Sequence, residues 1–107
     1  MSMDIIRIFL KHPRRYIPDI NKKIPKTRKY QINIVKKFLF YLKKELKIKN
    51  FNQITEFELN KYIEVIKQKG IWNNKNKRFE KISERTLKNH ISILKQFLKR
   101  IKIQSGA

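Results

Sequence analysis

Apolar residues recur three or four positions apart through two long stretches of the chain, which is the spacing of one face of an α-helix. The first stretch runs from Arg28 to Leu46 and the second from Glu84 to Lys102. A third stretch with the same spacing follows Thr55, and a short first helix is predicted at Met3 to Lys11. No alternating run indicates a sheet. The pattern therefore predicts an all-α bundle of four helices, the first of them short.

Residues with capping chemistry flank these stretches. Thr27 is a plausible N-cap for the second helix. Thr55 and Glu58 stand three positions apart, as in a capping box where each side chain satisfies an end amide of the other residue. Gly70 is expected to end that third helix. Ser83 is the expected N-cap of the last helix.

Two segments between the helices lack helical periodicity. Three prolines fall between Lys11 and Lys26, so an irregular connector is expected there. The polar and basic stretch from Ile71 to Ile82 predicts a loop or a short hairpin-like insertion. Trp72 and Phe79 flank its centre, and we expect them to fold back onto the core rather than stack on bases.

The length of 107 residues indicates one domain. We expect residues 1–26 to form the first helix and its connector within that domain. Residues 27–103 are expected to form the helical core, and residues 104–107 a tail or a linker.

The composition of the chain indicates the kind of partner it has. The chain has 28 Lys and Arg against 8 Asp and Glu, a formal net charge of +20, which points to a polyanionic partner. Hydrophobic residues make up 40% of the chain, enough for a core rather than a disordered basic tail. No cysteine is present, which excludes disulfides and thiolate metal ligands. The first ten residues are too short and too charged for a signal peptide or membrane span.

The positive charge gathers on two of the predicted helices. On the last helix, basic and small polar residues repeat three or four apart opposite the apolar face. On the second helix, lysines recur every seven residues, with others beside them on the same side. We call each of these rows of side chains a ridge. The two ridges are expected to be aligned with one another and to contact DNA phosphates, which would give a salt-sensitive affinity. The candidate DNA-binding residues are Arg28, Lys29, Lys36, Lys37, Lys43, Arg85, Lys88, Asn89, Ser92, Lys95 and Lys99.

Other candidate sites are expected to be structural. His90 lies at the edge of the apolar face, and His12 is the only other histidine, so no metal site is expected. Phe40 projects among the lysines of the second helix, where it is either covered by the first helix or a neighbouring protomer, or is a lone surface Phe. No paired carboxylates, Ser/His/Asp set or Gly-rich phosphate loop is present. We therefore expect no catalytic residue, cofactor or small-molecule substrate in this chain.

The chain resembles the N-terminal core-binding domain of tyrosine recombinases, the phage-integrase family. The resemblance extends from about Asp4 to Ile101. It rests on Thr27 with Tyr30, Phe38-Leu39-Phe40-Tyr41-Leu42, Ile54-Thr55 with Tyr62-Ile63, and the run SERTLKNHISILKQFL from Ser83 to Leu98. The segment from Ile71 to Ile82 is longer than the usual link of the family.

This resemblance implies a SAM-like orthogonal bundle that forms half of a clamp around duplex DNA, with the second and fourth helices at the major groove. It also implies that the catalytic residues belong to a second domain following residue 107. Its partners would then include other recombinase protomers on the DNA. Its location would be the cytoplasm, in association with the nucleoid.

Two other functions compete with DNA binding. A stand-alone protein-interaction module would use Phe40 and the Trp72 loop. Binding to an anionic membrane would need the apolar faces that the bundle core is expected to occupy.

Overall fold

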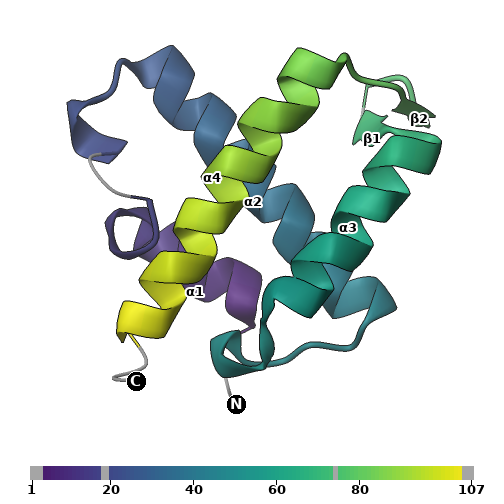
Figure 1. Ribbon diagram of the computed structural model, residues 1–107. Coiled ribbons are helices and arrows are strands. Elements are labelled where there is room, and N and C mark those ends of the chain that lie inside the picture. Colours follow the sequence, from purple (N-terminus) through teal and green to yellow (C-terminus); the bar gives the residue numbers. More distant parts are fainter. Residues whose placement is uncertain (1–3, 18–19, 74, 105–107) are drawn as a thin grey trace.

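Four α-helices and a small hairpin make up the part of the chain that the computed structural model describes, residues 4–17, 20–73 and 75–104 (Figure 1). The helices are α1 (Ile5–Lys11), α2 (Pro25–Glu45), α3 (Glu56–Lys69) and α4 (Glu84–Gln104). The hairpin strands are β1 (Ile71–Asn73) and β2 (Arg78–Glu80), and 3₁₀ turns occupy Pro13–Arg15, Ile20–Lys22 and Phe51–Gln53. The predicted mainly helical bundle with a short first helix is confirmed.

The predicted caps of the third and fourth helices are confirmed. The backbone amide of Thr55 donates to Glu58 Oε1 over 2.8 Å, and Thr55 Oγ1 accepts from the amide of Phe57 over 3.2 Å. Ser83 Oγ accepts from the amide of Thr86 over 3.2 Å at the start of α4. Gly70 ends α3 with φ at 92°, a left-handed conformation that glycine adopts readily.

The predicted start of the second helix is wrong. Its N-cap is Ile24 rather than Thr27, and Pro25 takes the first helical position. Proline fits there because its fixed φ is helical and its missing N–H would have no partner in the first turn. The boundary expected between residues 26 and 27 therefore falls inside α2, and Leu46 is its C-cap.

The other ends differ from the prediction by small amounts. Asp4 caps α1, accepting from the amide of Ile6 over 2.7 Å, while the predicted first residue, Met3, lies outside the described residues. Helix α4 continues to Gln104, and the rest of the expected tail also lies outside the described residues. Two 3₁₀ turns lie within the connector that was expected to be irregular.

The segment after Gly70 forms a two-stranded antiparallel sheet, although no sheet was expected. Ile71 pairs with Glu80, Trp72 with Phe79 and Asn73 with Arg78. Strands of three residues are too short to produce a recognisable alternation in the sequence. The alternative of a hairpin-like insertion is confirmed.

An aromatic cluster centred on Phe97 of α4 joins the elements. Its ring centroid lies 5.9 Å from that of Phe9 on α1, 5.8 Å from Tyr16, and 6.3 Å from both Phe38 on α2 and Phe51. Phe97, Phe9 and Phe38 are fully buried. The tilted and edge-on ring arrangements are the favourable ones for aromatic pairs. One side chain of α4 therefore holds together four separate segments of the chain.

Replacing Phe97 with Ala should lower the free energy of unfolding by about 3–5 kcal/mol, because a cavity opens among four rings. Urea denaturation followed by circular dichroism measures the loss. Ile103→Ala, on the exposed side of the same helix, is the control and should change stability by no more than about 0.5 kcal/mol. Phe97→Leu offers a milder variant if the Ala variant does not fold. Equal effects of the Phe97 and Ile103 substitutions would refute the central role of the cluster.

Candidate nucleic-acid interface

Helix α4 exposes a continuous basic side. Arg85, Lys88, Ser92, Lys95 and Lys99, spaced three, four or seven positions apart, are all exposed and share this side of the helix. Glu84 is the only acidic residue of α4. Among the described residues, Lys88, Lys95 and Lys99 have no carboxylate within 4.0 Å. No carboxylate in the described part of the chain therefore pairs with them.

The lysines of α2 are less uniformly available. Lys29 and Lys36 are exposed, but Lys43 Nζ lies 2.6 Å from Asp4 Oδ2, the cap of α1. The pKa of Asp4 is lowered chiefly by this hydrogen bond from Lys43. Arg28 is half-buried, and its guanidinium donates to the carbonyl oxygen of Lys23 over 3.3 Å. Lys43 and Arg28 thus have contacts within the protein that sequence reasoning did not show.

The two ridges do not form one surface, in contrast to the expected alignment. His90 of α4 faces α2, with its ring centroid 6.0 Å from that of Tyr30. Lys88 and Lys99 lie two and nine positions from His90, which at about 100° per residue puts them close to the opposite side of α4. On α2, the ridge ends at Lys43 beside α1. Helix α4 lies in front of α2 in Figure 1. Its ridge, on the side opposite His90, therefore faces away from α2.

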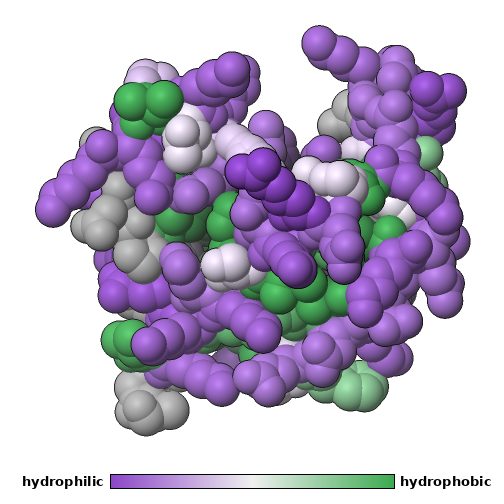
Figure 2. All heavy atoms as spheres, turned by 45° about the horizontal axis from the view of Figure 1, so that its top comes forward, coloured by the Kyte–Doolittle hydropathy of each residue, from purple (hydrophilic) through white to green (hydrophobic). Residues whose placement is uncertain are grey.

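Another group of residues lies where α2 and α4 cross. His90 is 8% exposed, and its ring packs edge-on against that of Tyr30. The pKa of His90 is lowered by burial first and then by the charge of the half-buried Lys37. Asn89, next to His90, is exposed. Figure 2 brings forward the end of the molecule where α2 and α4 begin, and hydrophilic side chains cover most of it, with apolar ones between them. The expected place of His90 at the core edge is confirmed.

The hairpin aromatics do not fold back onto the core, which corrects the expectation for Trp72 and Phe79. Trp72 is 40% and Phe79 47% exposed, and their ring centroids lie 5.2 Å apart across the two strands. Neighbouring residues of a strand point to opposite faces, so the partly buried Ile71 takes the inner face and Trp72 the outer one. Sequence reasoning missed this because the strand pairing was not known.

Phe40 stays uncovered by the first helix. It is 56% exposed, and Lys44 Nζ lies 5.8 Å from its ring centroid.

Burial raises the pKa of Tyr62, Tyr16 and Tyr41, which keeps these hydroxyls protonated. In the part of the chain that the structure describes, no group of three or more His, Asp or Glu side chains could hold a metal ion.

Comparisons with known proteins add no relative. No family model matches the chain, and searches of curated proteins and of solved structures find no match either. None of the described helices has the length and apolar character needed to cross a membrane.

The buried position of His90 predicts a pH-dependent stability. Burial, and then the charge of Lys37, lower the pKa of His90 below its usual 6.5. Between the two pKa values the unfolded chain binds more protons than the folded one, so stability is full above pH 6.5 and falls as the pH drops through 6.5 towards the folded pKa.

Urea denaturation at a series of pH values from 7.5 to about 5 should therefore show a decline in wild type that His90→Gln reduces. His12→Gln is the matched control, because His12 is exposed, and it should keep the wild-type decline. An identical pH profile in the His90 and His12 variants would contradict the assignment.

Proposed function

We propose that this chain binds duplex DNA, with α4 as the main contact. The observation that carries the proposal is the exposed side of α4, where Lys88, Lys95 and Lys99 have no carboxylate within 4.0 Å among the described residues. Neutralising phosphates with such lysines releases condensed counterions and so drives association. A protein surface offers no comparable density of negative charge.

The dimensions of α4 suit the major groove. A helix of 21 residues is about 31 Å long and, with its side chains, about 10–12 Å wide, while the groove is about 12 Å wide. With α4 in the groove, Arg85 and Ser92 on its outward side face base edges, and Asn89 lies between that side and the crossing with α2. Lys88, Lys95 and Lys99 then reach the phosphates of one strand.

The finer part of the proposal concerns the class of protein. A tyrosine-recombinase core-binding domain of SAM-like fold accounts for four helices in which the second and fourth cross. In such a protein the present chain grips DNA, and a separate domain performs the chemistry. The lysines of α2, on another side of the molecule, then serve the part of the clamp that curves around the duplex.

Fluorescence anisotropy with a labelled duplex of about 25 base pairs tests the proposal. For roughly six to ten phosphate contacts, log K should fall against log salt with a slope of about −0.9 per contact. Replacing Lys88, Lys95 and Lys99 by Glu should reduce the affinity on the order of a hundredfold at fixed salt. The slope should become shallower by about one for each phosphate that is no longer neutralised.

The matched control is the triple substitution Lys49→Glu, Lys61→Glu and Lys67→Glu. It changes the net charge equally, at exposed positions away from α4, and should have a much smaller effect. Circular dichroism verifies that both triple variants fold, and Gln replaces Glu if the α4 variant does not. Equal reductions in affinity in the two variants would show that net charge alone attracts DNA. A salt-independent affinity would overturn the proposal itself.

A further inference from the structure

The hairpin that joins α3 to α4 carries two exposed aromatic rings on a basic segment. Trp72 and Phe79 lie directly opposite one another on β1 and β2, and Lys69 Nζ lies 5.8 Å from the centre of the Phe79 ring. The two rings pack against one another, with centroids 5.2 Å apart, and a contiguous exposed apolar patch is typical of an interaction site. The hairpin is thus a second surface outside the basic side of α4.

The base of the hairpin is fixed to α3. A Cβ on Gly70 would meet the backbone carbonyl of Glu80, and would lie only 2.6 Å from the amide nitrogen of Lys81. The two backbones therefore pack together directly, which only glycine permits at this position and with φ at 92°. The hairpin is held in one orientation relative to the bundle.

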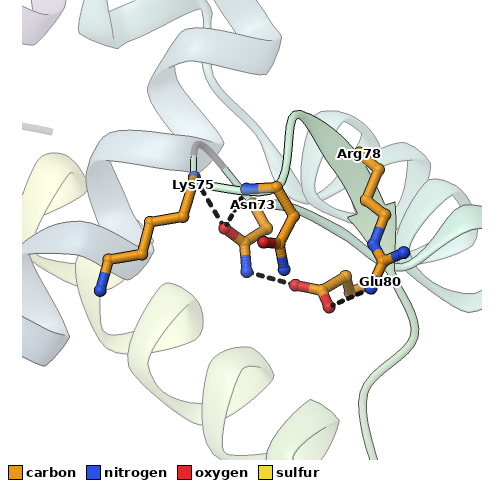
Figure 3. Close-up of polar contacts among 5 residues, drawn as sticks. Asn73, Lys75, Arg78 and Glu80 are labelled. Carbon is orange, nitrogen blue, oxygen red and sulfur yellow. Dashed lines mark hydrogen bonds and ion pairs between the residues drawn. The ribbon is translucent and has the colours of Figure 1, made fainter.

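A polar network closes the tip of the hairpin (Figure 3). Asn73 Oδ1 accepts from the amides of Lys75 and Asn76, over 2.8 and 3.2 Å. Asn73 Nδ2 donates to Glu80, which also lies 3.5 Å from the guanidinium of Arg78. The only acidic side chain of the hairpin is therefore already engaged, whereas the side chain of Lys75 extends away from the network.

The charge of this segment selects among possible partners. Lys75, Lys77, Arg78 and Lys81 are exposed, and no other acidic residue lies between Gly70 and Ser83. Aromatic rings surrounded by cations suit a partner that carries both negative charge and flat apolar groups. Nucleic acid has both, in its phosphates and its bases. A neutral apolar protein surface would leave these cations without partners.

Position links the hairpin to the same duplex. It lies at the end of the molecule where α4 begins, and three residues separate Glu80 from Glu84. Arg85, the first basic residue of α4, is therefore close to it in the chain. Resting on the proposed function, we propose that the hairpin contacts the duplex beside the stretch bound by α4, with Trp72 and Phe79 against its sugars and base edges.

The chain contains one tryptophan, so Trp72 reports on its own site. Titrating the full chain with unlabelled duplex should change the indole emission in step with the binding curve obtained by anisotropy. Replacing Trp72 and Phe79 together by Leu should weaken duplex binding about tenfold, because Leu presents less flat apolar surface to the sugars and base edges. The salt slope should stay unchanged, since no cation is removed.

Phe57→Leu is the matched control. Phe57 is 63% exposed and has Lys61 Nζ 4.9 Å from its ring centroid, but it lies on α3 and should not affect binding. Trp72→Tyr keeps an aromatic ring and should retain most of the affinity. This variant shows whether the loss in the Leu variant comes from the missing rings.

The outcomes separate this inference from the proposed function. Salt-dependent duplex binding with constant Trp72 emission and full affinity in the Leu variant overturns the hairpin contact while leaving α4 as the interface. Absence of any duplex binding overturns the proposed function as well. Tighter binding of a single strand of equal length, with a larger change in emission, also overturns the duplex contact.

Discussion

The fold depends on the packing of Phe97 against rings from α1, the connector, α2 and the 3₁₀ turn before α3. These segments all lie far from Phe97 in the sequence, and among the described residues few hydrogen bonds other than those of the helices join them to α4. The same helix that supplies Phe97 also exposes Lys95 and Lys99, two positions away on either side. The core therefore fixes how α4 rotates about its axis, and this rotation decides which cations face outward.

Electrostatic repulsion is the force that this core has to overcome. A formal charge of +20 on 107 residues destabilises a compact state. Of the ion pairs between described residues, the Lys43–Asp4 pair joins two helices, but it is exposed and contributes little. Hydrophobic burial is thus the main force that opposes this repulsion. A polyanion that neutralises the ridge of α4 would also relieve this repulsion, so binding and folding would favour one another.

The sequence predicts features that depend on neighbours along the chain. The capping box at Thr55, the stop at Gly70 and the cap at Ser83 are local, and all three are confirmed. The prediction for the start of α2 was wrong because Thr27 has the chemistry of an N-cap. The helix instead begins at Pro25, whose restricted backbone suits the first helical position. Periodicity gives the side of each helix on which a lysine lies, but not how two helices are rotated relative to each other. The divergence of the two ridges and the pairing of Trp72 with Phe79 therefore required three-dimensional structure.

The conformational cost of binding follows from where the cations are placed. Lysines on a disordered tail would have to order the backbone as well as the side chain, whereas those of α4 stand on a helix whose backbone the core already fixes. Only their side-chain freedom remains to be restricted. A lysine is a flexible point charge that attracts any phosphate alike, so under the proposed function the ridge by itself would give affinity without sequence preference. Discrimination among sequences must then come from the few polar side chains at the start of α4. Arg85 and Asn89 have the donors and acceptors for guanine and adenine edges, and the crossing with α2 holds that end of the helix in place.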